Sequence, residues 1–263
     1  MTFQVLISTM FEKDYSLLEK MNVQSDCIVV NQTDNNSVSK FKFQNHNIIW
    51  VNSSDRGLSK SRNLGLKYVT ADFILLADND EVFHNNYQSN IIQEFNKTNA
   101  DLLTFNINSI GGIKKRFTNL KYKKLNRFNI FRYGSARIAF LRNILVKHNI
   151  TFNEKFGAGT PRLNGEDSLF LNSFLSNGAK CISSPLFIAD INDTTSTWFK
   201  GYDEDYFYNK GYFFYELFPK KSRLAICYYA IKHGKQFKNV GICKGFKLML
   251  KGRKDNKKAH KRY

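Results

Sequence analysis

The sequence predicts an α/β fold in which a mostly parallel, doubly wound sheet lies between helices. Short apolar segments with strand character alternate with helical segments through residues 1–106, which is the pattern of parallel strands joined by helices. Hydrophobic residues make up 42% of the 263 residues, so the chain can bury a large core and is not disordered. No apolar run reaches the roughly 18 residues that a membrane-spanning helix needs.

Strands and helices are expected in a regular order along this first part. The strand segments are short, apolar and rich in β-branched residues. The helix expected at 57–69 places Ser61 and Gly65 on one face, where close packing on a sheet requires small side chains. In chain order the expected elements are strand 3–8, helix 14–21, strand 27–31, strand 47–51, helix 57–69, strand 72–77, helix 86–96 and strand 101–106. Ligands of such sheets bind beyond the carboxyl ends of the strands, so residues that follow strands are the first site candidates.

The second half of the chain has a less regular pattern. Residues 107–134 are polar, basic and aromatic, which indicates loops with short strands. A strand is expected at 135–141 and a short helix at 142–148. Residues 166–177 are expected to form a helix, because apolar residues recur along it and Gly178 is a typical helix stop.

The net charge of +18 is concentrated in two segments. Residues 111–137 hold nine basic and no acidic residues, and residues 219–263 hold fifteen basic residues and one acidic residue. The rest of the chain is almost neutral. Such basic segments indicate surfaces for phosphate groups, whether of nucleic acid, of anionic lipid or of a phosphorylated substrate.

An acidic triplet follows the fourth expected strand. Asp78 and Asp80 flank Asn79 directly after the apolar segment, where charged side chains cannot belong to the core. Two carboxylates one residue apart can converge on a hard cation such as Mg²⁺ or Mn²⁺, which also takes water and phosphate oxygens. A solvated acidic turn before a helix is the alternative interpretation.

The context of the triplet resembles a known family. The segment 56–65 reads RGLSKSRNLG, and an apolar strand that ends in the D-x-D of Asp78 and Asp80 follows it. This order and spacing is similar to family-2 glycosyltransferases, which have the GT-A fold, and the resemblance extends over about residues 1–215. The chain looks most like the bacterial enzymes that assemble capsular and other surface polysaccharides. The resemblance implies a catalytic domain at 1–218, with a nucleotide-sugar-binding half at 1–106 and an acceptor-binding half at 107–218.

The resemblance also implies a donor site. Asp78 and Asp80 would bracket the diphosphate of a nucleotide-sugar donor, expected to be a UDP-sugar, together with a Mn²⁺ or Mg²⁺ ion. The family usually has an acidic pair after its second strand, whereas this chain has Asn31-Gln32-Thr33-Asp34, so either Gln32 or Asp34 would contact the base or ribose. The remaining donor-binding candidates are Ser8, Thr9 and Arg62. For Arg62, a surface position on its helix is the alternative.

A second acidic pair opens the helix expected at 166–177. Glu166 and Asp167 follow a glycine-rich segment at 157–160. Acidic residues also favour the first turn of any helix, so ordinary helix initiation is the alternative. The resemblance implies that Asp167 is the catalytic base of an inverting enzyme, with Glu166 beside it and in contact with acceptor or donor hydroxyls. Such a base removes the proton of the acceptor hydroxyl as the new bond forms.

A third metal ligand is not evident from the sequence. Many relatives have a histidine after the next strand, but here the segment reads Ala189-Asp190-Ile191-Asn192-Asp193. Asp190 or Asp193 could take its place, or the metal could keep water. The segment 194–198 could order over a bound donor or be a plain loop.

The basic segment 219–263 is expected to be an amphipathic C-terminal extension. It mixes large apolar residues with lysine and arginine, as helices at membrane interfaces do. Either it binds the anionic inner face of the membrane, or its apolar residues pack on the catalytic domain. The N-terminus lacks signal-peptide features and the four cysteines lack metal-site spacing, so we expect a cytoplasmic, peripheral protein.

The expected activity is therefore metal-dependent sugar transfer to a hydroxyl of a growing, lipid-linked or oligosaccharide acceptor. A basic nucleic-acid-binding protein is the competing interpretation, but no binding motif is present and no nucleic-acid partner is expected. A nucleotidyltransferase on a related fold is a further alternative, although the glycine-rich phosphate loop expected near its first strand is missing.

Overall fold

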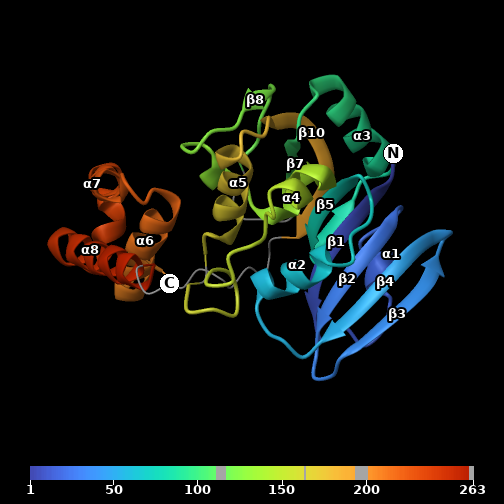
Figure 1. The fold of residues 1–263 in the computed structure, drawn as a ribbon, viewed down its shortest axis with the longest axis horizontal. Coiled ribbons are helices and arrows are strands. Elements are labelled where there is room, and N and C mark those ends of the chain that lie inside the picture. The colour runs from blue at the N-terminus through green and yellow to red at the C-terminus, as the bar shows by residue number, and fades with distance from the viewer. Residues whose placement is uncertain (111–116, 163, 193–200, 261–263) are drawn as a thin grey trace. The chain divides into compact units, whose positions relative to one another are not determined.

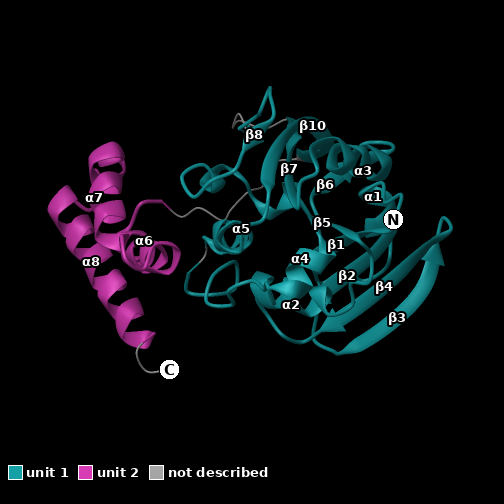
Figure 2. Cartoon of the chain, turned by 45° about the horizontal axis from the view of Figure 1, so that its top comes forward, with its two compact units in different colours: residues 1–195 teal, residues 196–263 magenta. Residues whose placement is uncertain are grey.

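The structure is a computed structural model that describes residues 1–110, 117–162, 164–192 and 201–260. The chain divides into two compact units, Met1–Thr195 and Ser196–Tyr263 (Figure 2). The first unit contains the sheet, the D-x-D and the second acidic pair, whereas the second unit is helical and contains the basic segment 219–263 (Figure 1). The segment 194–198 and Asp193 lie outside the described residues.

One sheet of ten strands organises the described part of the first unit. Its strands are β1 (Phe3–Met10), β2 (Asp26–Gln32), β3 (Ser37–Phe43), β4 (His46–Ser53), β5 (Phe73–Asp78), β6 (Glu81–Phe83), β7 (Leu102–Ile110), β8 (Lys123–Lys124), β9 (Ile138–Leu141) and β10 (Cys181–Asn192). Strands β4, β2, β1 and β5 are neighbours and all parallel. This parallel centre confirms the α/β prediction.

Helices cover both faces of the sheet. They are α1 (Leu17–Lys20), α2 (Leu58–Leu66), α3 (Tyr87–Thr98), α4 (Arg142–Lys147) and α5 (Glu166–Ser176). Because side chains alternate along a strand, Val5 and Ile7 of β1 join the core under α1 and α3, whereas Leu6 faces α2. On the α2 side, Phe140 of β9 packs against Phe170 of α5, with ring centroids 5.4 Å apart. The sheet is therefore doubly wound.

Helix α2 approaches the sheet closely because it presents small residues. A Cβ added to Gly65 would lie 2.2 Å from Leu6 Cδ1 and 3.1 Å from Val30 Cγ2. Ser61, one turn earlier, is buried, and its hydroxyl donates to Ser8 Oγ at 3.1 Å. The small-residue face predicted for this helix is thus confirmed.

The structure departs from the expected elements in its antiparallel strands. Strand β3 was not expected from the sequence, and it forms an edge hairpin with β4 through Gln44 and Asn45, both of which have positive φ. The strand expected at 135–141 begins as a 3₁₀ turn, Ser135–Arg137, and only then becomes β9. Strand β9 lies between β5 and β7 and is antiparallel to both. A strand of this kind cannot be distinguished from a parallel one by its own residues, because its partners are distant in sequence.

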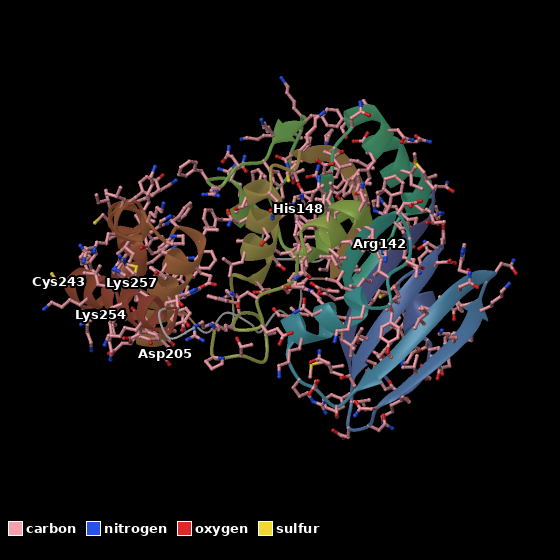
Figure 3. The ribbon with its side chains drawn as sticks, in the orientation of Figure 1. Arg142, His148, Asp205, Cys243, Lys254 and Lys257 are labelled. Atoms are coloured by element: carbon pink, nitrogen blue, oxygen red, sulfur yellow. The ribbon has the colours of Figure 1, made fainter. Side chains whose placement is uncertain are left out.

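The second unit consists of α6 (Glu204–Leu217), α7 (Ser222–Lys232) and α8 (Ile242–Ala259), with a 3₁₀ turn at Gly234–Phe237. Figure 3 labels Cys243, Lys254 and Lys257 along α8. Helix α6 packs on α8, so this unit starts before the boundary at 218/219 that the charge pattern suggested. In the part of the chain that the structure describes, no helix is both long and apolar enough to cross a bilayer.

Glycines allow α6 and α8 to touch backbone to backbone. A Cβ at Gly211 would lie 1.8 Å from the carbonyl oxygen of Met249, and one at Gly252 would lie 2.0 Å from that of Tyr208. A backbone atom cannot move aside as a flexible side chain can. The two helices must therefore separate if either glycine acquires a side chain.

We predict that Gly211→Ala destabilises the second unit by roughly 1–3 kcal/mol or more, the usual cost of overpacking. Hydrogen exchange of the backbone amides of α6 and α8 measures this directly. Gly234→Ala is the matched control, because no atom lies within 4 Å of a Cβ added there. Equal protection of α6 in both variants would contradict the helix contact.

Candidate active site

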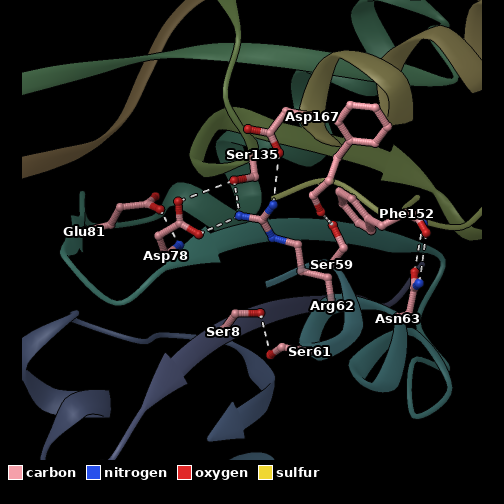
Figure 4. Close-up of polar contacts among 11 residues, drawn as sticks. Ser8, Ser59, Ser61, Arg62, Asn63, Asp78, Glu81, Ser135, Phe152 and Asp167 are labelled. Carbon is pink, nitrogen blue, oxygen red and sulfur yellow. Dashed lines mark hydrogen bonds and ion pairs between the residues drawn. The ribbon is translucent and has the colours of Figure 1, made fainter. Parts of the chain in front are cut away.

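The buried guanidinium of Arg62 is the centre of the site (Figure 4). It donates to Asp78 Oδ1 at 2.8 Å and to Asp167 Oδ1 at 2.9 Å, and it also hydrogen-bonds the hydroxyl of Ser135. The ring of Phe152 lies beside it, with its centroid 5.2 Å from Cζ. One side chain thus connects α2, the end of β5, the turn before β9 and the first turn of α5.

Contacts at the N-terminus of α2 fix the position of Arg62. The Gly57 amide donates to Gln32 Oε1 at 2.7 Å, and the Leu58 amide donates to the carbonyl of Ala158 at 2.9 Å. Gly159 adopts a positive φ, and a Cβ there would lie 2.9 Å from the Cα of Gly57. The glycine-rich segment therefore packs directly on the start of α2.

This packing brings the second acidic pair to Arg62. Gly157 also has a positive φ. A Cβ added to it would lie 3.1 Å from Ser59 Oγ and 3.3 Å from Glu166 Cδ. The Ser59 hydroxyl donates to the carbonyl of Phe156 at 2.7 Å. The glycines of this loop therefore allow the first turn of α5 to approach the first turn of α2.

The D-x-D lies where β5 ends. Asp78 is the last residue of β5, and its amide donates to Glu81 Oε1 at 2.6 Å, which closes the turn to β6. Its side chain is 36% exposed, so the carboxylate contacts both Arg62 and solvent. Asp80 lies in the exposed turn that follows. In the sheet register, Ser8 of β1 is the partner of Asp78, so these two predicted residues lie side by side.

The other predicted donor-binding residues lie at the same edge of the sheet. Thr9 is buried, donates to Glu12 and accepts a hydrogen bond from Asn79 at 3.0 Å. Gln32, at the end of β2, is buried against α2. Asp34 differs, because its side chain is 89% exposed and forms an ion pair with Arg56 at 2.7 Å.

Burial dominates the electrostatics of the acidic pair. It raises the pKa of Glu166 to about 8, helped by the negative charge of Asp167. Burial also raises the pKa of Asp167, although Arg62 opposes that shift. Burial alone would lower the pKa of Arg62, but the acidic groups of Asp78, Asp167 and Glu166 raise it. The guanidinium therefore stays protonated. Three acidic groups therefore surround one cation.

The candidate metal ligands do not form an evident cluster in the described part of the chain. Over the described ranges, no three His, Cys, Asp or Glu side chains gather in a way that could hold a metal ion. Asp190, a candidate third ligand, accepts from Asn108 at 2.8 Å and contacts His84 at 3.0 Å. Asp193, the other candidate, lies outside the described residues.

Two findings go beyond the sequence predictions. Arg62 is 1% exposed, so the alternative of a surface helix arginine is wrong. Ser135 was not predicted as a site residue, yet its hydroxyl contacts Arg62 and lies 3.4 Å from Asp78 Oδ2. The signal for Ser135 is topological. A strand antiparallel to β5 must begin near the carboxyl end of β5, and Ser135 begins the 3₁₀ turn that leads into β9.

Comparisons with known proteins identify the family of the chain and its fold. The family model described as Glycosyl transferase family 2 matches residues 16–163, which include α2, the D-x-D and the glycine-rich loop. The chain belongs to this family. No curated protein matches the chain.

Solved structures show the fold of this chain. A crystal structure of S. aureus TarS 1–349 in complex with UDP-GlcNAc has a TM-score of 0.61 and 16% identity, covering 82% of this chain and 66% of that chain. The complex of the same fragment with UDP has a TM-score of 0.59 and 17% identity, covering 82% of this chain and 65% of that one. A longer TarS structure is covered over only 39% of its length. The likeness establishes a GT-A fold, and TarS extends well beyond what the two chains share.

The raised pKa of Glu166 predicts a pH dependence of stability for this protein. Between about 4.5 and 8, the unfolded chain releases the Glu166 proton while the folded chain retains it. The free energy of unfolding should therefore fall as pH rises through this window, and Glu166→Gln should remove that contribution. The advantage of the variant over the wild type should grow from pH 5 to pH 8 in urea-unfolding experiments. The control Glu19→Gln removes an exposed carboxylate of α1 and should differ from the wild type by less. Parallel pH profiles for Glu166→Gln and the wild type would contradict the burial of a protonated carboxyl.

Proposed function

We propose that this glycosyltransferase moves one sugar from a UDP-linked donor to a hydroxyl of a growing, lipid-linked surface glycan. Family membership supports sugar transfer, and the TarS structures with UDP and UDP-GlcNAc support the choice of nucleotide. The observation that carries the proposal is the Arg62 ion pair with both Asp78 and Asp167. It joins the expected donor-binding turn to the expected catalytic base.

The donor would bind at the carboxyl ends of β1, β2 and β5. Asp78 and Asp80 would flank its diphosphate, Arg62 would support the same side, and Ser8, Thr9, Gln32 and Asp34 would contact the base, ribose or phosphates. Hydrogen bonds that already fix Ser8, Thr9 and Gln32 support a preformed pocket wall.

The residues at the D-x-D fit Mn²⁺ or Mg²⁺. Both carboxylates reach solvent, and water and diphosphate oxygens commonly complete the shell of such ions. A diphosphate is negative, and the carboxylates of Asp78 and Asp167 already outnumber Arg62, so a divalent cation would remove an unfavourable repulsion. When bound, the ion would stabilise the charge of the departing nucleotide.

Asp167 would act as the general base. It would accept the proton of the acceptor hydroxyl while that oxygen bonds to the anomeric carbon and the bond from this carbon to the diphosphate breaks. One displacement inverts the anomeric centre. Arg62 and the Ser135 backbone orient the carboxylate, and its 21% exposure leaves it accessible to an acceptor. Its raised pKa brings it closer to neutrality, where a general base is most effective.

Glu166 would contact a sugar hydroxyl instead of transferring the reactive proton. Its Oε2 is buried and has no hydrogen-bond partner among the described residues. With a pKa of about 8 the carboxyl is mostly protonated at neutral pH, so it can donate one hydrogen bond and accept another. A sugar hydroxyl would satisfy both.

The acceptor half would be 107–218, and the protein would work at the inner face of the cytoplasmic membrane. The described part of the basic segment, 117–137, exposes Leu120, Tyr122 and Phe128 beside its lysines. Aromatic and cationic groups together suit a phosphorylated lipid carrier or a sugar platform.

The donor class can be tested by incubating the protein with a panel of UDP-, GDP- and CDP-sugars, with and without Mn²⁺, and measuring released nucleotide. Hydrolysis confined to UDP-sugars supports the proposal. Activity with another nucleotide alone would reject the UDP assignment.

Asp167→Asn should reduce transfer roughly 100-fold or more and leave UDP binding within a few-fold of the wild type. The amide keeps the shape and can still accept from Arg62, but it cannot take a proton. Asp26→Asn is the control, because Asp26 starts β2 at the opposite edge of the sheet and should leave turnover unchanged. Unchanged turnover in Asp167→Asn would remove this residue from the role of base.

Asp80→Ala should weaken UDP binding in Mn²⁺ and abolish the dependence of that binding on the metal. The reason is the loss of one of the two carboxylates proposed to bind the ion. Calorimetric titration of UDP against both proteins, with Mn²⁺ and with chelator, measures the effect without requiring turnover. If Mn²⁺ enhances binding equally in both proteins, Asp80 is not a ligand.

A further inference from the structure

Helix α7 has apolar side chains on two opposite faces. Its inner face is buried in the second unit through Ser222, Ile226 and Tyr229. The opposite face, here called the outer face, carries large side chains that are 70%, 61% and 84% exposed: Leu224, Tyr228 and Ile231. Their spacing of four and then three residues places them on a single stripe of the helix.

Cations border this outer face. Arg223 and Lys232 are exposed on α7, and the Lys232 ammonium donates to the hydroxyl of Tyr228 at 2.9 Å. Other exposed cations follow closely at Lys220, Lys221, Lys235 and Lys238. The single acidic residue of 219–263, Asp255, is engaged by the hydroxyl of Tyr208 at 3.1 Å. An apolar stripe with basic flanks is the pattern of helices that lie in the plane of a membrane interface.

We propose that the outer face of α7 docks this glycosyltransferase on an anionic lipid surface. Leu224 and Ile231 enter the boundary between headgroups and acyl chains, while Arg223 and Lys232 pair with lipid phosphates. Docking would bring the enzyme to a lipid-linked acceptor, and in this respect it rests on the proposed function.

Charge favours a lipid surface over the other possible occupants. A second copy would bring two strongly basic segments together, which costs electrostatic energy. Nucleic acid would be bound by cations and aromatic rings, whereas this stripe presents Leu224 and Ile231 at its two ends. An anionic bilayer satisfies both the apolar stripe and its cationic borders.

Co-sedimentation of the full chain with vesicles tests the proposal. The wild type should bind vesicles of phosphatidylcholine with phosphatidylglycerol and not those of phosphatidylcholine alone. The double variant Leu224→Ser, Ile231→Ser should bind roughly tenfold or more weakly, because two aliphatic side chains no longer leave water. Val38→Ser, Val146→Ser is the control, since it also removes two exposed apolar side chains, 49% and 56% exposed, but from β3 and α4.

A second pair of variants tests the charges. Arg223→Gln, Lys232→Gln should weaken binding to anionic vesicles several-fold, and it should reduce the sensitivity of binding to salt, since each cation adds to the attraction. Lys40→Gln, Lys42→Gln on the edge strand β3 removes the same charge from a different surface and should bind as the wild type does.

Three outcomes would overturn the proposal. They are equal binding of the wild type to both vesicle types, unchanged binding of the Leu224 and Ile231 variant, and a dimer in light scattering that this variant dissociates. The last would assign the outer face to self-association. UDP binding by the wild type and by each variant is measured in parallel. A wild type that binds UDP but no vesicles rejects the outer-face proposal alone, whereas a wild type that does not bind UDP rejects the proposed function.

Discussion

The buried guanidinium of Arg62 is the constraint on which the rest of the site depends. Breaking a buried ion pair by removing one partner costs roughly 3–5 kcal/mol, because the remaining charge is left without compensation. Here one cation compensates Asp78 and Asp167, so its removal would leave two carboxylates facing each other. A lysine would be a poor substitute, because only the planar guanidinium directs several N–H groups at fixed angles to separate acceptors.

The small residues of the first unit can be understood as consequences of this buried charge. To bring the guanidinium between β5 and α5, α2 must lie close to the sheet, which Ser61 and Gly65 allow. The first turn of α5 must then approach α2, which the positive-φ glycines 157 and 159 allow. Phe152 closes the remaining side, and its ring stacks on Phe170 of α5 at 4.0 Å. Sequence elements that look like separate motifs therefore serve a single arrangement.

Most of the first unit was predictable because apolar strands and amphipathic helices are encoded locally. The position of β9 was not, because its antiparallel pairing with β5 and β7 is decided by contacts between distant segments. Ser135 was missed for the same reason. The burial of Arg62 could have been anticipated, since residues 61, 62 and 65 share one stripe of a helix whose small residues were expected to face the sheet. Charge alone made a surface position seem reasonable, whereas the ion pairs that permit burial come from residues far along the chain.

The two populations of charge in this protein differ in what surrounds them, and this difference separates their roles. Asp78 and Asp167 contact the buried guanidinium of Arg62 directly, at 2.8 and 2.9 Å, so these interactions are strong, directional and less screened by salt than those between exposed charges. Their arrangement can thus orient a carboxylate toward a reacting hydroxyl. The lysines of α7 and α8 are exposed, and at physiological ionic strength salt largely screens their interactions with charges more than about 8 Å away. Such charges cannot position a reacting group, but many of them acting together can hold a surface against an anionic one. Burial therefore suits the first group to chemistry, and exposure suits the second to attachment.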